Sequence, residues 1–166
     1  MNFTVSHDFD ISAQGYWDLF WSDDYNTDLY KQLNMRTRTV LEQKEEGNTL
    51  RRTQKLEPSL NVPSWANSVI KDTGYTEYDV YHRDRSEMEV RIEPQMMKDR
   101  FHMHAVFKVI PLGENRCRRE FAGEVKISVP LLGGKLEKYM VDQLRDAYEV
   151  AARVTREWVQ KRKAAT

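Results

Sequence analysis

The sequence predicts an α+β fold, in which a curved antiparallel sheet of about seven strands wraps around one long C-terminal helix, with two short helices after the first strand. Three observations support this prediction. Most segments between residues 35 and 129 alternate apolar and polar residues, which is typical of strands with one buried face. Short turn signals separate these segments, so neighbouring strands run antiparallel. Residues from about 134 to 163 carry an apolar stripe at helical spacing.

The chain begins with a strand and two short helices. Residues 2–11 alternate loosely and predict the first strand. Ser12 is a suitable N-cap for a short helix, whose apolar residues recur at helical spacing. Asp23 or Asp24 is expected to cap a second short helix, and no Gly or Pro run separates the two. The two helices should therefore meet at a sharp bend.

Six further strands are expected along the middle of the chain. They cover residues 35–44, 49–57, 75–83, 87–93, 100–110 and 116–129. The first two form a hairpin around Glu46-Gly47-Asn48, a strong turn signal. The longer connection 58–74 contains Trp65 and has room for one helical turn. In strand 100–110, Phe101 and its alternate neighbours share the face that should point inward.

The last element is a single long helix over about 134–163. Its apolar stripe consists of Leu136, Met140, Leu144, Ala147, Ala151, Val154 and Trp158. Such a stripe needs an apolar surface to cover it, and the sheet is the only large one predicted. One helix is about 10 Å across, so it cannot fill the concave side of a curled sheet of this size. Large side chains or a cavity must occupy the remaining volume.

Composition restricts the class of protein. The 166 residues suit one domain spanning 1–166, and 40% hydrophobic residues are too many for a disordered chain. No run approaches the roughly 20 apolar residues of a membrane span. A formal net charge of zero argues against a nucleic-acid partner. The single Cys117 rules out an internal disulfide and a cysteine-based zinc site. The N-terminus lacks signal-peptide features, so we expect a cytoplasmic protein. We also expect no cofactor.

Charge is unevenly distributed along the chain. Residues 1–33 hold six aspartates against Lys31, and the last fourteen residues hold five basic residues against Glu157. Basic residues suit the C-terminal end of a helix, where the helix dipole is negative, and we favour this interpretation. The alternative is a transient contact with an anionic membrane surface.

The order of elements and the run Val129-Pro130-Leu131-Leu132-Gly133-Gly134-Lys135-Leu136-Glu137 resemble the START-like superfamily. This superfamily has the helix-grip or SRPBCC fold and includes polyketide cyclases, aromatase-like proteins and the birch-pollen-allergen group. The resemblance covers roughly residues 2–160 and is closest to a poorly characterised bacterial START-like branch. It implies a deep apolar cavity between sheet and long helix that holds lipids, sterols, polyketides or other hydrophobic molecules.

The leading functional hypothesis is therefore the binding or transport of a hydrophobic small molecule, with a lipid as the preferred candidate. The residues expected to line the cavity come from the predicted inward faces of the strands and the long helix. They are Met88, Val90, Phe101, Met103, Phe107, Phe121, Met140, Leu144 and Tyr148. Arg119 is the candidate polar anchor, since Arg makes bidentate contacts with anionic headgroups.

Arg119 and Arg52 both fall on faces with apolar neighbours, where an unpaired charge is costly. Either side chain could meet the polar end of a ligand. The preferred alternatives are an ion pair with a carboxylate of the long helix, or a one-residue error in the predicted strand register.

Two further hypotheses stay open. The first is a cyclase- or dehydratase-type enzyme on the same scaffold, which needs a group in the cavity that can donate or accept a proton. The nominal candidates for this group are Tyr78, His82 and Arg119, and none has a visible partner in the sequence. The second is a protein-interaction module without a ligand. His102 and His104 have metal-like spacing, but they should face outward and lack a third ligand, so no metal is expected. The oligomeric state leaves no signal in the sequence.

Overall fold

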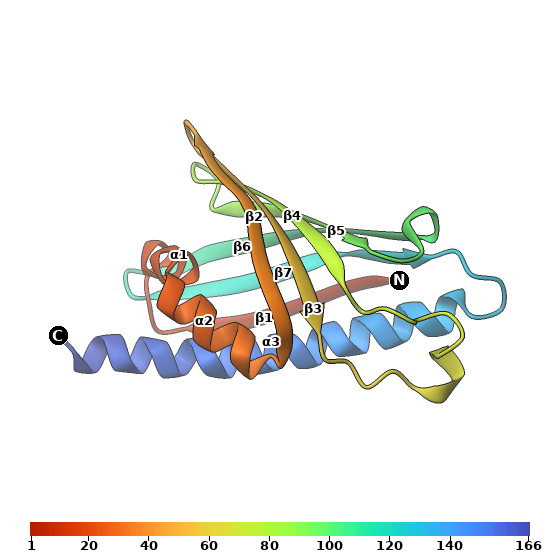
Figure 1. The fold of residues 1–166 in the computed structure, drawn as a ribbon. Coiled ribbons are helices and arrows are strands. Elements are labelled where there is room, and N and C mark those ends of the chain that lie inside the picture. Colours follow the sequence, from red (N-terminus) through yellow and green to blue (C-terminus); the bar gives the residue numbers. More distant parts are fainter.

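The computed structural model describes residues 1–166 as one seven-stranded antiparallel sheet with a long helix across one side (Figure 1). The strand order is β1-β7-β6-β5-β4-β3-β2, which confirms the predicted architecture. The strands are β1 (Asn2–Phe9), β2 (Met35–Glu46), β3 (Thr49–Pro58), β4 (Tyr75–His82), β5 (Glu87–Pro94), β6 (Phe101–Gly113) and β7 (Arg116–Ile127). The helices are α1 (Ala13–Phe20), α2 (Asp23–Gln32) and α3 (Gly133–Ala164), with single 3₁₀ turns at Ser64–Ala66 and Lys98–Arg100.

The two short helices follow β1 as predicted, with one difference at a cap. The Ser12 hydroxyl accepts a hydrogen bond from the Gly15 amide and so caps α1. The N-cap of α2 is Ser22, so the expectation that an aspartate caps this helix was wrong. Asp23 and Asp24 occupy the first turn instead, where their charge complements the positive end of the helix dipole.

The sheet has an inner and an outer face, which the alternation of buried and exposed residues in β6 shows most clearly. In β6, Phe101, Met103 and Ala105 are buried on the inner face, whereas His102 and His104 are exposed on the outer face. The hydrogen-bonded register continues these rows across the sheet, for example from β5 through β6 to β7. The inner face therefore carries the main hydrophobic core.

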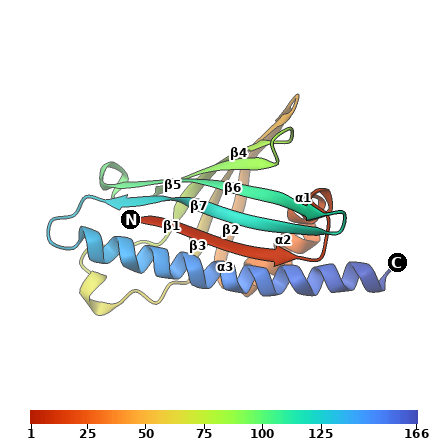
Figure 2. The same ribbon diagram turned by 180° about the vertical axis from the view of Figure 1, so that it is seen from behind.

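α3 packs on only one side of the concave face. It contacts β1, β7 and α2, and Figure 2 shows it running beside β1. The predicted stripe is confirmed at Leu136, Ala151 and Val154, which are buried. Four further positions are buried outside the predicted stripe: Val141, Ala152, Thr155 and Val159. Thr155 and Val159 are buried against α2, whereas Val141 and Ala152 pack into the main core against the sheet.

The start of α3 is tied to the edge of the sheet where β1 and β7 pair. The Glu137 carboxylate accepts hydrogen bonds from the Ile127 amide and from the Met1 ammonium group, each at 2.9 Å. The connection between β3 and β4 also docks here, since the Trp65 ring packs edge-on against Tyr139 and Lys135 lies over the Trp65 ring. The predicted helical turn in this connection is present at Ser64–Ala66.

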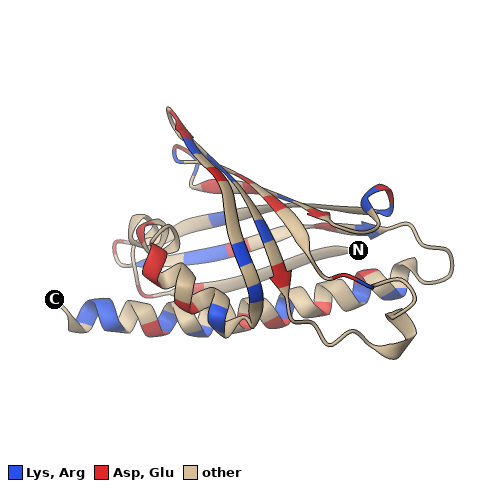
Figure 3. Cartoon of the chain, in the orientation of Figure 1, with Lys and Arg blue, Asp and Glu red and all other residues tan.

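The far end of α3 carries Lys161, Arg162 and Lys163 in its last turn (Figure 3). Cations at this end complement the helix dipole, as the favoured interpretation of the basic tail expects. No helix combines the length and the apolar composition needed to cross a membrane.

Two leucines close together in the chain test the role of the helix–sheet core. Leu136 has no exposed surface, whereas Leu131 is fully exposed. We expect Leu136→Ala to lower the free energy of unfolding by about 2–5 kcal/mol, because it leaves a cavity in the core. Leu131→Ala removes the same atoms from a solvated site and should change stability by under about 0.5 kcal/mol. Urea unfolding measures both, and equal losses would contradict the packing described.

Candidate functional site

The inner face of the sheet becomes polar where β3 and β4 pair. Arg52 and Gln54 of β3 lie opposite Asp79 and Glu77 of β4 in the hydrogen-bonded register. Strand alternation places all four side chains on the inner face, between Leu50 and Leu56, which are buried in β3. We call Arg52, Gln54, Glu77 and Asp79, together with Arg38 of β2, the inner polar cluster.

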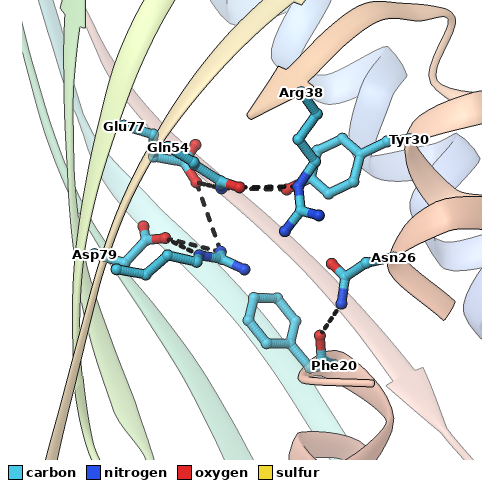
Figure 4. Close-up of polar contacts among 8 residues, drawn as sticks. Phe20, Asn26, Tyr30, Arg38, Gln54, Glu77 and Asp79 are labelled. Atoms are coloured by element: carbon cyan, nitrogen blue, oxygen red, sulfur yellow. Dashed lines mark hydrogen bonds and ion pairs between the residues drawn. The ribbon is translucent and has the colours of Figure 1, made fainter. Parts of the chain in front are cut away.

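Hydrogen bonds connect the members of this cluster (Figure 4). The Arg52 Nε and Nη2 atoms both lie 2.8 Å from Asp79 Oδ2, and Nη2 lies 3.8 Å from Glu77 Oε1. Gln54 Nε2 donates to Glu77 Oε1 at 2.7 Å, and Arg38 Nε donates to Gln54 Oε1 at 2.9 Å. The two carboxyl groups therefore converge on one guanidinium group.

Asp79 is the least satisfied member of the cluster. Its side chain is fully buried, and its Oδ1 atom has no hydrogen-bond partner. Burial raises the pKa of Asp79 well above its usual range, and the neighbouring Glu77 charge raises it further, although Arg52 opposes the shift. The site thus favours the protonated form of Asp79.

Three tyrosines from three different elements lie within electrostatic range of Glu77. They are Tyr30 of α2, Tyr75 of β4 and Tyr148 of α3. Burial is the main cause that raises the pKa of each phenol, and the Glu77 charge raises all three as well. All three side chains nevertheless retain accessible surface and are only half-buried. Glu77 therefore shares its surroundings with phenol groups from three elements, none of which is fully buried.

Apolar side chains continue this half-buried region towards α3. Ile92 of β5 and Met140 and Leu144 of α3 contact the main core but are not fully buried. The predicted lining residues of the sheet lie on the inner face as expected and are packed into the core: Met88, Val90, Phe101, Met103, Phe107 and Phe121. Contact of any of these residues with a ligand remains a prediction.

Arg119 faces inward, so the predicted register of β7 is correct. Its expected ion pair with a helix carboxylate is absent, because its Nη2 atom contacts His7 Nδ1 at 2.9 Å and the Tyr148 carbonyl oxygen at 3.1 Å. Guanidinium groups only donate, so His7 must accept at Nδ1 and donate from Nε2 to Glu149, which lies 2.8 Å away. The rings of Tyr148 and Phe9 flank the cation. Arg119 is thus enclosed by its own neighbours.

The structure also corrects the expectation for Arg52, which pairs with a carboxylate of the neighbouring strand rather than of the long helix. Tyr78 and His82 were nominal proton-moving candidates, but both lie on the outer face. Arg91 stacks over the Tyr78 ring, and His82 contacts Glu89. Sequence reasoning missed Glu77 and Asp79, although alternation in β4 places them on the same face as Tyr81, which is buried.

A surface groove of 480 Å³ lies at the end of β5 and β6. Its charged and imidazole side chains are Arg91, Glu93, Lys98, Asp99, His102 and His104. Because both charge signs alternate along this open groove, it presents no single ligand chemistry. The inner polar cluster is therefore the better candidate site.

Comparison with solved structures places this chain among proteins with the same architecture. An aromatase/cyclase, Zhui from Streptomyces sp. R1128, matches with a TM-score of 0.68 and 10% identity over 98% of this chain and 96% of that chain. Norcoclaurine synthase from Thalictrum flavum, in complex with dopamine and hydroxybenzaldehyde, matches with a TM-score of 0.66 and 11% identity over 97% and 88% of the two chains. A START superfamily protein from Mycobacterium smegmatis matches with a TM-score of 0.57 and 15% identity over 96% and 97%.

These matches show that the chain has the helix-grip fold of the START-like, or SRPBCC, superfamily. A family model described as "Protein of unknown function (DUF2505)" matches residues 4–159. Comparison with curated proteins gave no match.

The protonation of Asp79 can be tested through stability. Because its folded pKa is raised above the unfolded value, the stability that comes from its bound proton is lost as pH rises towards the folded pKa. We expect Asp79→Asn, which mimics the neutral acid, to gain stability relative to the wild type as pH rises from about 4. Urea unfolding over a series of pH values measures the difference.

Asp8→Asn is the matched control with the opposite sign. A hydrogen bond from Arg118 is the main cause that lowers the pKa of Asp8, so its contribution is present above the unfolded pKa and lost as pH falls. Asp8→Asn should therefore lose stability relative to the wild type as pH rises over the same range. If both variants shift in the same direction, the assignment of a protonated Asp79 is wrong.

Proposed function

The chain belongs to the DUF2505 family, and from its interior geometry we propose that it binds a small hydrophobic molecule that carries one polar group. The ligand lies between β4 and β5, the connection 58–74 and the first half of α3. Its apolar body contacts Ile92, Met140 and Leu144, and its polar end faces the inner polar cluster.

One observation carries this proposal. Side chains of β5 and α3 pack against the main core, and Tyr30 of α2 contacts Gln54 of β3, yet these side chains keep accessible surface while neighbours on the same elements are fully buried. In α3, for example, Leu136 and Val141 are buried, whereas Met140, Leu144 and Tyr148 are half-buried. Apolar surface left accessible inside a fold is the usual property of a ligand pocket. Burying ligand surface there contributes roughly 25 cal/mol per Å².

The inner polar cluster restricts the class of ligand that can bind. The carboxyl and guanidinium groups of the cluster are already paired with one another, so a charged group on the ligand would compete with these pairs. A hydroxyl or carbonyl group forms hydrogen bonds there and leaves the pairs intact. A neutral lipid meets this requirement, and so does a small aromatic compound such as the ligands named for the norcoclaurine synthase complex. Transfer of the ligand between membranes is a further step that this proposal does not need.

Catalysis is the second candidate function, because Glu77 and Asp79 on the inner face supply titratable groups, whereas Tyr78 and His82 lie on the outer face. The fold is shared with an aromatase/cyclase, which is consistent with chemistry at such a pocket. Fold alone does not decide between binding and catalysis.

Binding can be tested by filling the half-buried region. We expect the wild type to bind 2-naphthol, a neutral bicyclic probe, with a change in tryptophan fluorescence. Leu144→Trp places a larger side chain where the apolar body of the ligand should lie, and should weaken binding at least about tenfold, or about 1.4 kcal/mol. Fluorescence titration at constant protein concentration gives both affinities.

Arg145→Trp is the control, since it introduces the same side chain at the next, exposed position of α3. It should bind 2-naphthol like the wild type. Oleic acid in a parallel titration tests the lipid hypothesis, and weaker binding than that of 2-naphthol is expected because of its carboxylate. A wild type that binds neither probe, or equal affinity in both Trp variants, would refute the proposed pocket.

A further inference from the structure

We propose that β2 pairs edge to edge with β2 of a second copy of this chain, about a two-fold axis between Val40 and Leu41. This inference goes beyond the proposed function, since no ligand takes part in it. The interaction surface is the outer edge of β2 from Arg36 to Glu46. The partner that fits this surface is the same strand running antiparallel.

The first support is the position of β2 at an uncovered edge of the sheet. The strand order puts β1 at one edge and β2 at the other (Figure 1). α3 runs beside β1, whereas α2 contacts β2 from the inner side, where Arg38 lies over the Tyr30 ring. Apart from Arg38, every residue from Arg36 to Glu46 is exposed. The unpaired N–H and C=O groups of such an edge are a template for another strand.

The composition of β2 is the second support. Edge strands are commonly short or carry Lys and Pro, which discourage pairing, but β2 has 12 residues, no Pro and one Lys. Val40 and Leu41 stand at its middle and are 41% and 54% exposed. They are the only two neighbours in the chain among the large apolar residues left exposed. Pairing of two copies covers this apolar centre.

The charges of β2 make the strand complementary to itself. Arg36 and Arg38 precede the apolar centre, whereas residues 42–46 after it carry three glutamates against one lysine (Figure 3). Antiparallel pairing about the proposed axis sets Arg36 of each copy opposite Glu45 of the other, and no like charges stand directly opposite each other. The same patch serves both copies, as a two-fold dimer requires. Parallel pairing in register would instead set like charges side by side.

The irregularity of β2 fits the same axis. Its register with β3 shifts between Val40 and Glu42, so Leu41 is the extra residue of a bulge. Alternate residues point their backbone groups away from β3, and one extra residue changes these from even to odd numbers across the bulge. Antiparallel pairs that join even to odd numbers need an axis between two residues. The axis between Val40 and Leu41 meets this need, and the bulge bends both copies alike.

Sedimentation equilibrium of the purified wild-type chain tests the proposal. One strand pair is a small interface, so we expect a reversible dimer with a Kd of about 1–100 μM. Arg36→Glu sets glutamates opposite each other at two symmetric positions and should raise the Kd at least about tenfold. The double variant Arg36→Glu/Glu45→Arg restores opposite charges, so its Kd should return to within about threefold of the wild-type value.

Arg85→Glu is the matched control. Arg36 and Arg85 are 60% and 51% exposed, and each pairs with one glutamate of its own chain, but Arg85 lies in the turn between β4 and β5. Its variant should dimerise like the wild type. A wild type that stays monomeric at about 100 μM overturns the proposal. A dimer that Arg36→Glu leaves unchanged, or that the double variant does not restore, also overturns it.

A cysteine pair tests the register without relying on charge. Thr39 and Glu42 face each other across the proposed axis, so Thr39→Cys/Glu42→Cys should form a covalent dimer on mild oxidation. Within one strand these residues are about 10 Å apart, beyond the reach of a disulfide. The native Cys117 is buried. Thr39→Cys/Glu46→Cys is the control, because its cysteines do not meet in this register. Equal cross-linking of the two variants on a non-reducing gel would overturn the pairing.

Discussion

The structure depends on one packing constraint: a single long helix must cover a seven-stranded sheet that is far wider than itself. α3 lies against β1 and β7 and is supported from the side by α2. The inner faces of β3, β4 and β5 are left to other elements, namely the short helices, the connection 58–74 and large side chains. The half-buried residues lie where α3, the short helices and the connection 58–74 adjoin one another. The candidate site is therefore a consequence of the architecture, and the residues there determine only its chemistry.

The two buried arginines of the interior have different kinds of partner. Arg52 pairs with Asp79 and lies near Glu77, whereas Arg119 has no carboxylate partner and is surrounded by His7, Tyr148 and Phe9. Buried charges contribute little or negatively to stability, so a polar row across an apolar sheet is poorly explained by folding alone. Sequences that break a local rule of this kind commonly do so at functional sites. This contrast is why the inner polar cluster, rather than Arg119, is the centre of the functional account.

Local patterns predicted most of the fold, and the missing parts are those that depend on distant contacts. Strict alternation is a property of one segment, so the inward face of β6 and the orientation of Arg119 could be read from the sequence. In β4 both faces carry polar and aromatic residues, so the sequence pattern could not distinguish the face of Glu77 from that of Tyr78. The partner of Arg52 follows from the pairing of β3 with β4. The burial of Val141 and the partial exposure of Met140 depend on how α3 is rotated between two supports.

The central claim is that the partly covered half of the sheet leaves apolar space between Ile92, Leu144 and Tyr148. A crystal structure determined under xenon pressure tests this most directly, because xenon enters apolar cavities that water leaves empty. The account predicts a xenon atom in van der Waals contact with these three side chains, and its absence from crystals of Leu144→Trp. A wild-type crystal that takes up xenon only at its surface, with side chains closed over this region, would contradict it.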